Sequence, residues 1–322
     1  MKIFRSPAEV PADFGPSVVT IGNFDGVHSG HREIMRRVVS IARERGLTSA
    51  VLTFDPHPAR VLAPDRAPKL ISTVPQRLCR LAKEGIDAAL LLPFSLEFAA
   101  LSPEDFVETI LVRTLKTRCV LVGEDFRFGF RQSGNIETLR TLGERFGFDL
   151  QPVEAIGGRG ERISSTRIRN LVMEGRVSKA CRLMGAPFAL EGRVVSGQGI
   201  GSKKTVPTLN LAPENELLPK TGVYVTRTRD EQSGSEWHSI TNVGYRPTFD
   251  GEGLTVETFL LDPPPDTAPA RIEVAFLTFV RPERKFESPE LLKTQILRDV
   301  GAAQRFHRRV ERLRMGSFGR MG

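Results

Sequence analysis

Apolar and amphipathic stretches alternate along the first half of the chain, and this pattern predicts strands that alternate with helices. Residues 17–21 form a short β-branched run, which is typical of a buried strand. Ile34, Val38 and Ala42 then recur at helical spacing, and a second apolar run follows at residues 48–54. A strand, a helix and a second strand in this order form a βαβ unit, whose crevice lies at the carboxyl ends of the strands.

The same alternation continues to about residue 153. Alternating strands and helices of these lengths favour an open, mostly parallel sheet with helices on both faces. Loops that follow the strands should therefore meet at one edge of the sheet. Further helices are expected at residues 72–84, 102–111 and 133–146, and further strands at residues 86–92, 119–122 and 148–153.

The pattern changes after Ala186-Pro187, which we interpret as a linker. Gly and Pro turns now separate short strands, and this arrangement is typical of a small antiparallel barrel or sandwich. We therefore predict a first domain at residues 1–185, a second at residues 186–307 and a basic tail at residues 308–322. The expected strands of the second domain are residues 189–196, 222–228, 237–243, 255–261 and 271–280.

A terminal helix is expected after the last of these strands. Ser288 can cap it and Pro289 can occupy its first position. The apolar residues that helical spacing places on its inward face are Leu291, Leu292, Ile296 and Val300.

Composition limits the class of protein. The chain has 322 residues, of which 40% are hydrophobic and 26% charged, so it can bury a full core and is long enough for two domains. No run reaches the roughly 18 apolar residues of a membrane span, and no apolar leader follows Met1, so we expect a cytoplasmic protein. Cys79, Cys119 and Cys181 are widely spaced, which favours reduced thiols over a disulfide framework or a zinc site.

The loop after the first βαβ strand has the residues of an anion site. Gly22 to Gly26 can form a sharp turn, and a helix follows. His28 and His31 are three residues apart at the start of that helix, so they share a face beside its unsatisfied N–H groups. Gly30 between them would let a base or phosphate approach the backbone closely. The alternative is that both histidines are surface residues of an ordinary helix.

A second anion-binding pattern is ISSTRIRN, at residues 163–170. Ser164 or Ser165 can cap the helix that follows, and hydroxyls beside free N–H groups suit phosphate. Thr166 and Arg169 share a helical face, so Arg169 is the preferred phosphate ligand and Arg167 is secondary. A serine-capped helix with exposed arginines is the alternative.

The second half of the chain has candidates for a further phosphate site. Gly197, Gly201 and Lys203 lie in a glycine-rich loop that could cover phosphates, although a solvated hairpin is the alternative. Thr208 and Asn210 supply hard oxygen ligands that can hold Mg²⁺ together with ATP phosphates. Glu257 lies within an apolar strand, and the pattern leaves its direction open.

These motifs together resemble a known family. GNFDGVHSGH and ISSTRIRN look like the nucleotidyltransferase motifs of bacterial bifunctional riboflavin kinase/FAD synthetase. The resemblance implies an N-terminal Rossmann-like nucleotidyltransferase domain with a parallel sheet, in which His28 and His31 stabilise charge while an FMN phosphate oxygen attacks the α-phosphorus of ATP. Arg169 would hold pyrophosphate. The remaining ATP or phosphate ligands would be Gly22, Phe24, Gly30, Ser164, Ser165 and Thr166, and the flavin ligands Phe54, Pro56, Asp125, Phe128 and Arg246.

The second half resembles the riboflavin kinase module of the same family. The glycine loop, PTLN, NVGYRPTF and the glutamate after them appear in family order. The resemblance implies a C-terminal small antiparallel β-barrel with a terminal helix, in which Thr208 and Asn210 bind Mg·ATP and Glu257 is the general base for riboflavin. Two departures are Thr205-Val206, where the family commonly has Gly-Phe, and Phe259, where it often has His.

The sequence therefore predicts an α/β plus β enzyme that phosphorylates riboflavin to FMN and adenylylates FMN to FAD, with ATP and Mg²⁺. One alternative is a mononucleotide adenylyltransferase with an inactive kinase-like barrel. Another is an RNA-binding module, which the net charge of +8 allows but which one Trp and two Tyr disfavour, so nucleic acid is not expected as a partner. No membrane partner is expected, and the oligomeric state is left open.

Overall fold

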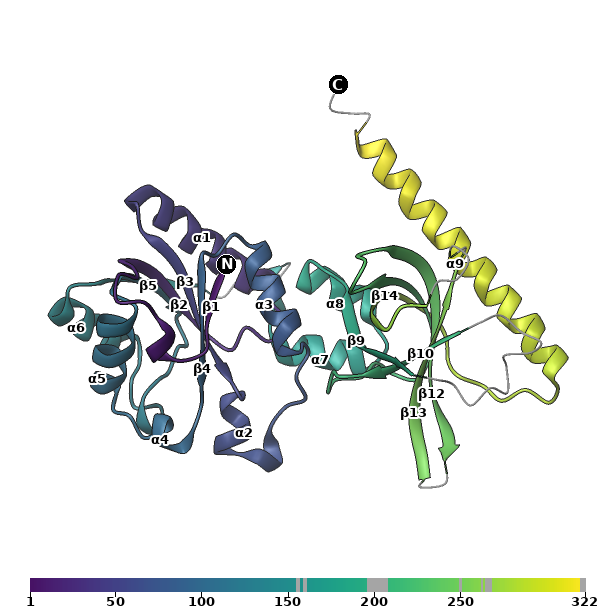
Figure 1. The fold of residues 1–322 in the computed structure, drawn as a ribbon, viewed down its shortest axis with the longest axis horizontal. Coiled ribbons are helices and arrows are strands. Elements are labelled where there is room, and N and C mark those ends of the chain that lie inside the picture. Colours follow the sequence, from purple (N-terminus) through teal and green to yellow (C-terminus); the bar gives the residue numbers. More distant parts are fainter. Residues whose placement is uncertain are drawn as a thin grey trace. The chain divides into compact units, whose positions relative to one another are not determined.

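The chain divides into two compact units, Met1–Ser165 and Thr166–Gly322, in the computed structural model (Figure 1). Each unit has a hydrophobic core of its own. The structure describes residues 1–154, 157–158, 161–195, 208–248, 251–261, 263 and 268–318.

The first unit is built on a six-stranded sheet in the order β1-β4-β3-β2-β5-β6. All its pairings are parallel, as the alternation of strands and helices predicts. The edge strand β1 was not expected from the sequence, because only three residues form it. The strands are β1 (Lys2–Phe4), β2 (Ser17–Ile21), β3 (Thr48–Asp55), β4 (Ala88–Pro93), β5 (Thr117–Gly123) and β6 (Asp149–Val153).

Helices cover both faces of this sheet (Figure 1). Helices α1 (Ser29–Arg45) and α3 (Val74–Lys83) pack on one face, through residues such as Met35 and Leu81. The other face is covered by α5 (Pro103–Phe106), the π-helical segment Val107–Thr114 and α6 (Ile136–Phe146). The expected single helix at residues 102–111 is therefore an α-helical turn followed by a π-helical segment. Two short helices, α2 (Pro58–Leu62) and α4 (Leu96–Ala99), lie in the connections after β3 and β4.

The second unit contains a closed six-stranded barrel in the order β10-β13-β12-β11-β14-β9. Its pairings are antiparallel, so the barrel is confirmed and the sandwich is not. The expectation of five strands is wrong, because β10 completes the barrel where the sequence suggested a ligand loop. The strands are β9 (Phe188–Val195), β10 (Leu209–Pro213), β11 (Gly222–Asp230), β12 (Glu236–Thr248), β13 (Gly251–Leu260) and β14 (Arg271–Arg281).

Hydroxyl groups line part of the barrel interior. Thr226 contacts Ser239 at 2.8 Å and Thr241 at 2.7 Å between side-chain oxygens, and Thr241 contacts Thr258 at 2.9 Å. All four side chains are fully buried. Since successive strand residues point to opposite faces, their neighbours along the same strands point out of the barrel.

The terminal helix α9 (Pro289–Phe318) lies along the outside of the barrel (Figure 1). Ala303 and Val300 of α9 pack with Val223 and Ile240 of the barrel in one hydrophobic cluster. The prediction that Leu291 faces inward is wrong: it is 53% exposed, because the packed cluster begins farther along the helix. Helices α7 (Ser165–Met173) and α8 (Val177–Met184) complete the structure.

None of the helices that the structure describes is both long enough and apolar enough to span a bilayer.

Candidate functional site

The loop that follows β2 is held by buried polar contacts. The carboxylate of Asp25 accepts hydrogen bonds from the backbone N–H groups of Ile71 (2.9 Å) and Ser72 (3.2 Å). The backbone carbonyl of Asp25 accepts a hydrogen bond from the hydroxyl of Ser165 at 2.9 Å. Asp25 is itself buried, so its contacts fix the path of the loop between Gly22 and His28.

Arg77 of α3 ties this loop to the end of β3. One of its terminal nitrogens donates to the carbonyl of Asn23 (3.0 Å), and the other donates to the carbonyl of Phe54 (2.9 Å). Its side chain is only 4% exposed, and burial lowers its pKa. Nothing in the sequence predicts this role, because an arginine beside a helical apolar stripe is usually solvated.

His28 and His31 lie together at the start of α1. Their rings are stacked, with centroids 3.6 Å apart and planes 17° apart. His28 caps the helix, since its Nδ1 accepts a hydrogen bond from the backbone N–H of His31 at 3.4 Å. The proton of neutral His28 therefore resides on Nε2, which remains a donor.

Both histidines are neutral in the folded protein. Burial lowers the pKa of His28 from 6.5 to about 4. Burial and the neighbouring His28 hold the pKa of His31 well below its ordinary value. Each ring can thus donate one hydrogen bond to a developing negative charge without carrying a full positive charge.

Two glycines and a phenylalanine shape this end of the loop. A Cβ on Gly30 would lie 3.2 Å from the His28 ring, so glycine leaves room for the stacked pair. A Cβ on Gly22 would lie 3.1 Å from the ring of Phe24. Phe24 is buried, and its ring meets His31 edge-on at 5.1 Å between centroids. Phe24 and Gly30 therefore shape the packing around the histidines, and Gly22 leaves room for Phe24. Binding of ATP by these three residues remains a prediction.

The predicted serine-arginine pattern begins α7. Ser164 and Ser165 are half-buried in the first unit, whereas Thr166 and Arg169 belong to the second by their contacts. Thr166 is exposed and Arg169 is half-buried. Binding of phosphate by this pattern remains a prediction.

A large aromatic cavity of about 630 Å³ lies in the first unit. Three of the predicted flavin ligands, Phe54, Asp125 and Phe128, line it, and Pro58 lines it whereas Pro56 does not; binding of flavin by these residues remains a prediction. Gly22 and Asn23 also line it, so the cavity adjoins the loop that leads to His28. A planar, largely apolar ligand fits such walls.

Sequence reasoning missed most of the aromatic wall. Single phenylalanines scattered over more than seventy residues have no common spacing, so the sequence offers no signal for them. They meet only in the fold: Phe94 and Phe98 contact Phe54 at centroid distances of 5.6 and 6.1 Å. The phenylalanines of the cavity that were not predicted are Phe94, Phe98, Phe106, Phe126 and Phe130.

A second cavity of about 350 Å³ lies in the second unit and is lined by barrel strands and by α9. Glu257 lines it, together with Thr208 and Asn242. Glu257 is paired in register with Asn210 on one side and with Asn242 on the other. The open question of its direction is therefore answered: Glu257 faces out of the barrel toward this cavity, while its neighbour Thr258 is buried inside.

An ion pair holds α9 at the edge of this cavity. The Nε of Arg281 lies 3.0 Å from an oxygen of Asp299, and its Nη2 lies 2.7 Å from the same oxygen. Gln295 donates to the other oxygen of Asp299 at 2.7 Å. Arg284 lies over the ring of Phe286, 4.7 Å from its centroid. The pair between Arg281 and Asp299 fixes α9 against the end of β14. The sequence did not predict this pair, because its two residues lie in separate elements and share no motif.

Several predicted ligands cannot be placed. Gly197, Gly201 and Lys203, like the Thr205-Val206 departure, lie outside the described residues. Arg246 lies on β12, but its side chain is also outside what the structure describes. Within the described part of the chain, His, Cys, Asp and Glu side chains form no group of three that could hold a metal ion.

Comparison with known proteins assigns the two halves of the chain to two families. Residues 10–167 match the FAD synthetase family, and residues 184–307 match the riboflavin kinase family. The bifunctional riboflavin kinase/FMN adenylyltransferase of Escherichia coli K12 is 36% identical over 289 residues, which cover 90% of this chain and 92% of that protein. The protein of the same name from Pseudomonas fluorescens is 36% identical over 305 residues, which cover 94% and 97%.

A solved structure has the same fold. A crystal structure from Streptococcus pneumoniae, described as a macrolide-efflux protein, has a TM-score of 0.83 and 29% sequence identity. The similarity covers 94% of this chain and 98% of that one, so it includes both units.

We expect Arg77→Met to lower the free energy of unfolding by about 2–4 kcal/mol, because two buried carbonyls would lose charged donors. Urea unfolding measures the change. Lys83→Met on the exposed side of the same helix is the matched control and should change stability by less than about 0.5 kcal/mol. Equal losses in both variants would contradict the role of Arg77.

The lowered pKa of His28 predicts a pH-dependent stability. An unfolded histidine ionises near pH 6.5. Between that pH and about 4, the unfolded chain binds a proton that folded His28 does not, so stability should fall as the pH falls through this window. His28→Asn should reduce the slope of stability against pH there by about 1.4 kcal/mol per pH unit. Above pH 7 the two proteins should have the same slope, and identical slopes throughout would rule out a depressed pKa.

Proposed function

Because the chain belongs to the family of bifunctional riboflavin kinase/FMN adenylyltransferases, it phosphorylates riboflavin to FMN and adenylylates FMN to FAD, and we propose which of its residues perform each reaction. The observation that supports the proposal is that each unit has a cavity beside the residues of one family motif. Residues 1–185 would carry out adenylylation and residues 186–307 phosphorylation.

In the adenylylation reaction, FMN occupies the aromatic cavity of the first unit. Phe54 and Phe128 contact the flavin, and the cavity's border at Gly22 and Asn23 directs the flavin phosphate toward His28. A phosphate oxygen of FMN attacks the α-phosphorus of ATP, a new P–O bond forms, and the bond to the β,γ-pyrophosphate breaks. Charge grows on the bridging oxygens during this step. Neutral His28 and His31 donate hydrogen bonds to it, and Arg169 holds the departing pyrophosphate.

In the kinase reaction, riboflavin occupies the cavity lined by barrel strands and α9. Glu257 accepts the proton of the terminal ribityl hydroxyl as that oxygen attacks the γ-phosphorus of ATP, and ADP leaves. Glu257 is supported as the base by its position on the cavity wall between Asn210 and Asn242 in register. Phe259, where the family often has His, lines the same wall, so the departure changes the surface that meets the flavin and leaves the base in place.

Mg²⁺ is the proposed cofactor. Thr208 and Asn210 supply a hydroxyl and an amide oxygen, which are hard ligands that suit Mg²⁺ only when ATP phosphates complete its coordination. The bound cation would neutralise phosphate charge in the transition state. The substrates and products are ATP, riboflavin, FMN and FAD. Three free cysteines support a reducing, cytoplasmic location.

A time course with riboflavin, ATP and Mg²⁺, resolved by chromatography, tests the division of roles. The unchanged protein should form FMN first and then FAD. We expect His28→Ala to accumulate FMN and to form FAD at least about 100-fold more slowly, because transition-state donors are lost. Glu257→Gln should form little FMN but should still convert added FMN to FAD. Loss of both reactions in either variant, with an unchanged circular dichroism spectrum, would contradict the assignment.

The ion pair between Arg281 and Asp299 should set riboflavin affinity. We expect Asp299→Asn to raise the KM for riboflavin about tenfold, because α9 loses a charged contact worth about 1.4 kcal/mol at the cavity edge. The kcat of the kinase should change by less than about twofold, since Glu257 is untouched. Glu290→Gln, at an exposed position of α9, is the matched control. An unchanged KM for riboflavin in Asp299→Asn would show that the ion pair between Arg281 and Asp299 does not set riboflavin affinity.

A further inference from the structure

The loop between β2 and α1 has a strained backbone. Phe24 and Val27 have positive φ angles, of 49° and 39°. Such angles are uncommon for residues other than glycine, and they are a genuine outlier for a β-branched residue such as valine. A backbone conformation of this kind persists only where the surrounding structure imposes it.

Side chains of neighbouring elements impose the conformation on this loop. The carbonyl of Asn23 accepts hydrogen bonds from the hydroxyl of Thr53 (3.2 Å) and from Arg77 (3.0 Å). The carbonyl of Gly26 accepts one from a terminal nitrogen of Arg80 (3.1 Å). The strained turn is therefore fixed by donors that lie outside it.

The ring of Phe24 fills a closed space beside this turn. It is 2% exposed and belongs to the hydrophobic cluster that includes Met35 of α1 and Leu78 of α3. A Cβ on Gly22 would lie 3.1 Å from the Cζ of Phe24, so the tip of the ring reaches the backbone there. Phe24 lines neither reaction cavity, so its ring does not form part of the wall that a flavin would meet.

His31 depends on other rings for its orientation. Its Nδ1 is buried and has no hydrogen-bond partner among the described residues. The imidazole is stacked on His28, and the ring of Phe24 meets it at an angle of 76° with centroids 5.1 Å apart. Stacked rings can slide and turn within their own planes, so the stack alone leaves the direction of the His31 nitrogens unfixed. Contact with a third ring at a steep angle restricts that motion.

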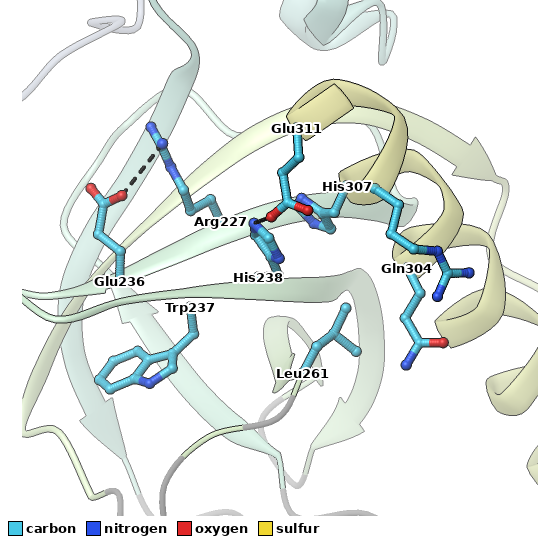
Figure 2. Close-up of a pocket in the computed structure, with 9 residues that line it drawn as sticks. Arg227, Glu236, Trp237, His238, Leu261, Gln304, His307 and Glu311 are labelled. Carbon is cyan, nitrogen blue, oxygen red and sulfur yellow. Dashed lines mark ion pairs between the residues drawn. The ribbon is translucent and has the colours of Figure 1, made fainter. Parts of the chain in front are cut away.

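A second stacked histidine pair, in the barrel unit, is oriented by different contacts. The rings of His238 and His307 have centroids 3.8 Å apart, and Glu311 lies 3.6 Å from the Nε2 of His238 (Figure 2). His307 has hydrogen bonds with the backbone at Ser239 and Thr226. Polar partners therefore orient those two rings, whereas aromatic packing orients the ring at the start of α1.

We propose that Phe24 is a positioning residue for adenylylation, whose ring holds the imidazole of His31 in the orientation that donates to the developing charge. The inference rests on the proposed role of His31 in that reaction. The bonds to Asn23 and Gly26 maintain the strained turn, and the turn keeps the ring beside His31. Phe24 thus acts through His31, in place of the direct contact with ATP that the family resemblance implies.

The variant Phe24→Leu tests this role. Leucine keeps an apolar side chain on the same strained backbone and removes the ring. With added FMN, ATP and Mg²⁺, we expect the kcat of FAD formation to fall about tenfold, because a misplacement of about 1 Å can cost up to about 100-fold in rate. The KM values for FMN and for ATP should change by less than about twofold, since Phe24 does not bind either substrate.

Phe14→Leu is the matched control for the loss of a buried ring. Phe14 is buried, and its ring meets Phe4 edge-on with centroids 5.6 Å apart, but it lines neither reaction cavity. Both variants should lower the urea midpoint of unfolding by similar amounts. Only Phe24→Leu should lower the kcat, which separates positioning from general destabilisation.

A double-mutant cycle with His31 shows whether Phe24 acts through that residue. His31→Asn alone should lower the kcat of FAD formation about 100-fold, as expected for the loss of a transition-state donor. Phe24→Leu added to His31→Asn should lower the kcat by no more than about a further twofold, because the imidazole that Phe24 positions is then absent.

Three results would overturn the proposal. An equal loss of kcat from Phe24→Leu in the presence and in the absence of His31 would show that Phe24 acts independently of it. A raised KM for ATP with an unchanged kcat would show that Phe24 binds ATP directly. An unchanged kcat in His31→Asn would contradict the catalytic role of His31 itself, whereas the first two results leave that role intact.

Discussion

The buried guanidinium of Arg77 is the contact on which the first unit's site depends. Parallel strands end at one edge of a sheet, and the loops that leave them carry backbone carbonyls that must find donors away from water. Arg77 donates hydrogen bonds to the carbonyls of Asn23 and Phe54. It thereby fixes the distance between the loop that leads to His28 and the end of β3, where Phe54 forms part of the wall of the aromatic cavity. Arg77 thus holds together the two segments that border the proposed flavin and nucleotide sites.

The barrel unit obeys a different constraint, which is the two-residue period of its strands. Thr241 and Thr258 bury their hydroxyls inside the barrel, so Asn242 and Glu257, one position away, must face outward. Helix α9 covers that outer face and turns an exposed glutamate into the wall of a cavity. Because the helix is needed to form the cavity, the contacts that hold it, from Asp299 to His307, belong to the kinase unit as much as the strand residues do.

The two histidine pairs illustrate how burial assigns different roles to the same side chain. His28 and His31 stack at a helix start and stay neutral, so they can act as hydrogen-bond donors without attracting a counter-ion of their own. His238 and His307 stack between a strand and a helix, with Glu311 near one ring and an unpaired nitrogen on the other. For His28, His31 and His307, packing lowers the pKa, and a sequence does not record packing.

The sequence alone determined the features that are local or periodic. The alternation of apolar and amphipathic stretches predicted the parallel sheet, and the three-residue spacing of His28 and His31 predicted that they share a helical face, because both follow from the geometry of a single element. Only the tertiary structure decided the sixth barrel strand, the direction of Glu257, the aromatic wall and the partners of Arg77 and Arg281. Those features join residues from separate elements, and packing between elements leaves no period in the sequence from which it could be inferred.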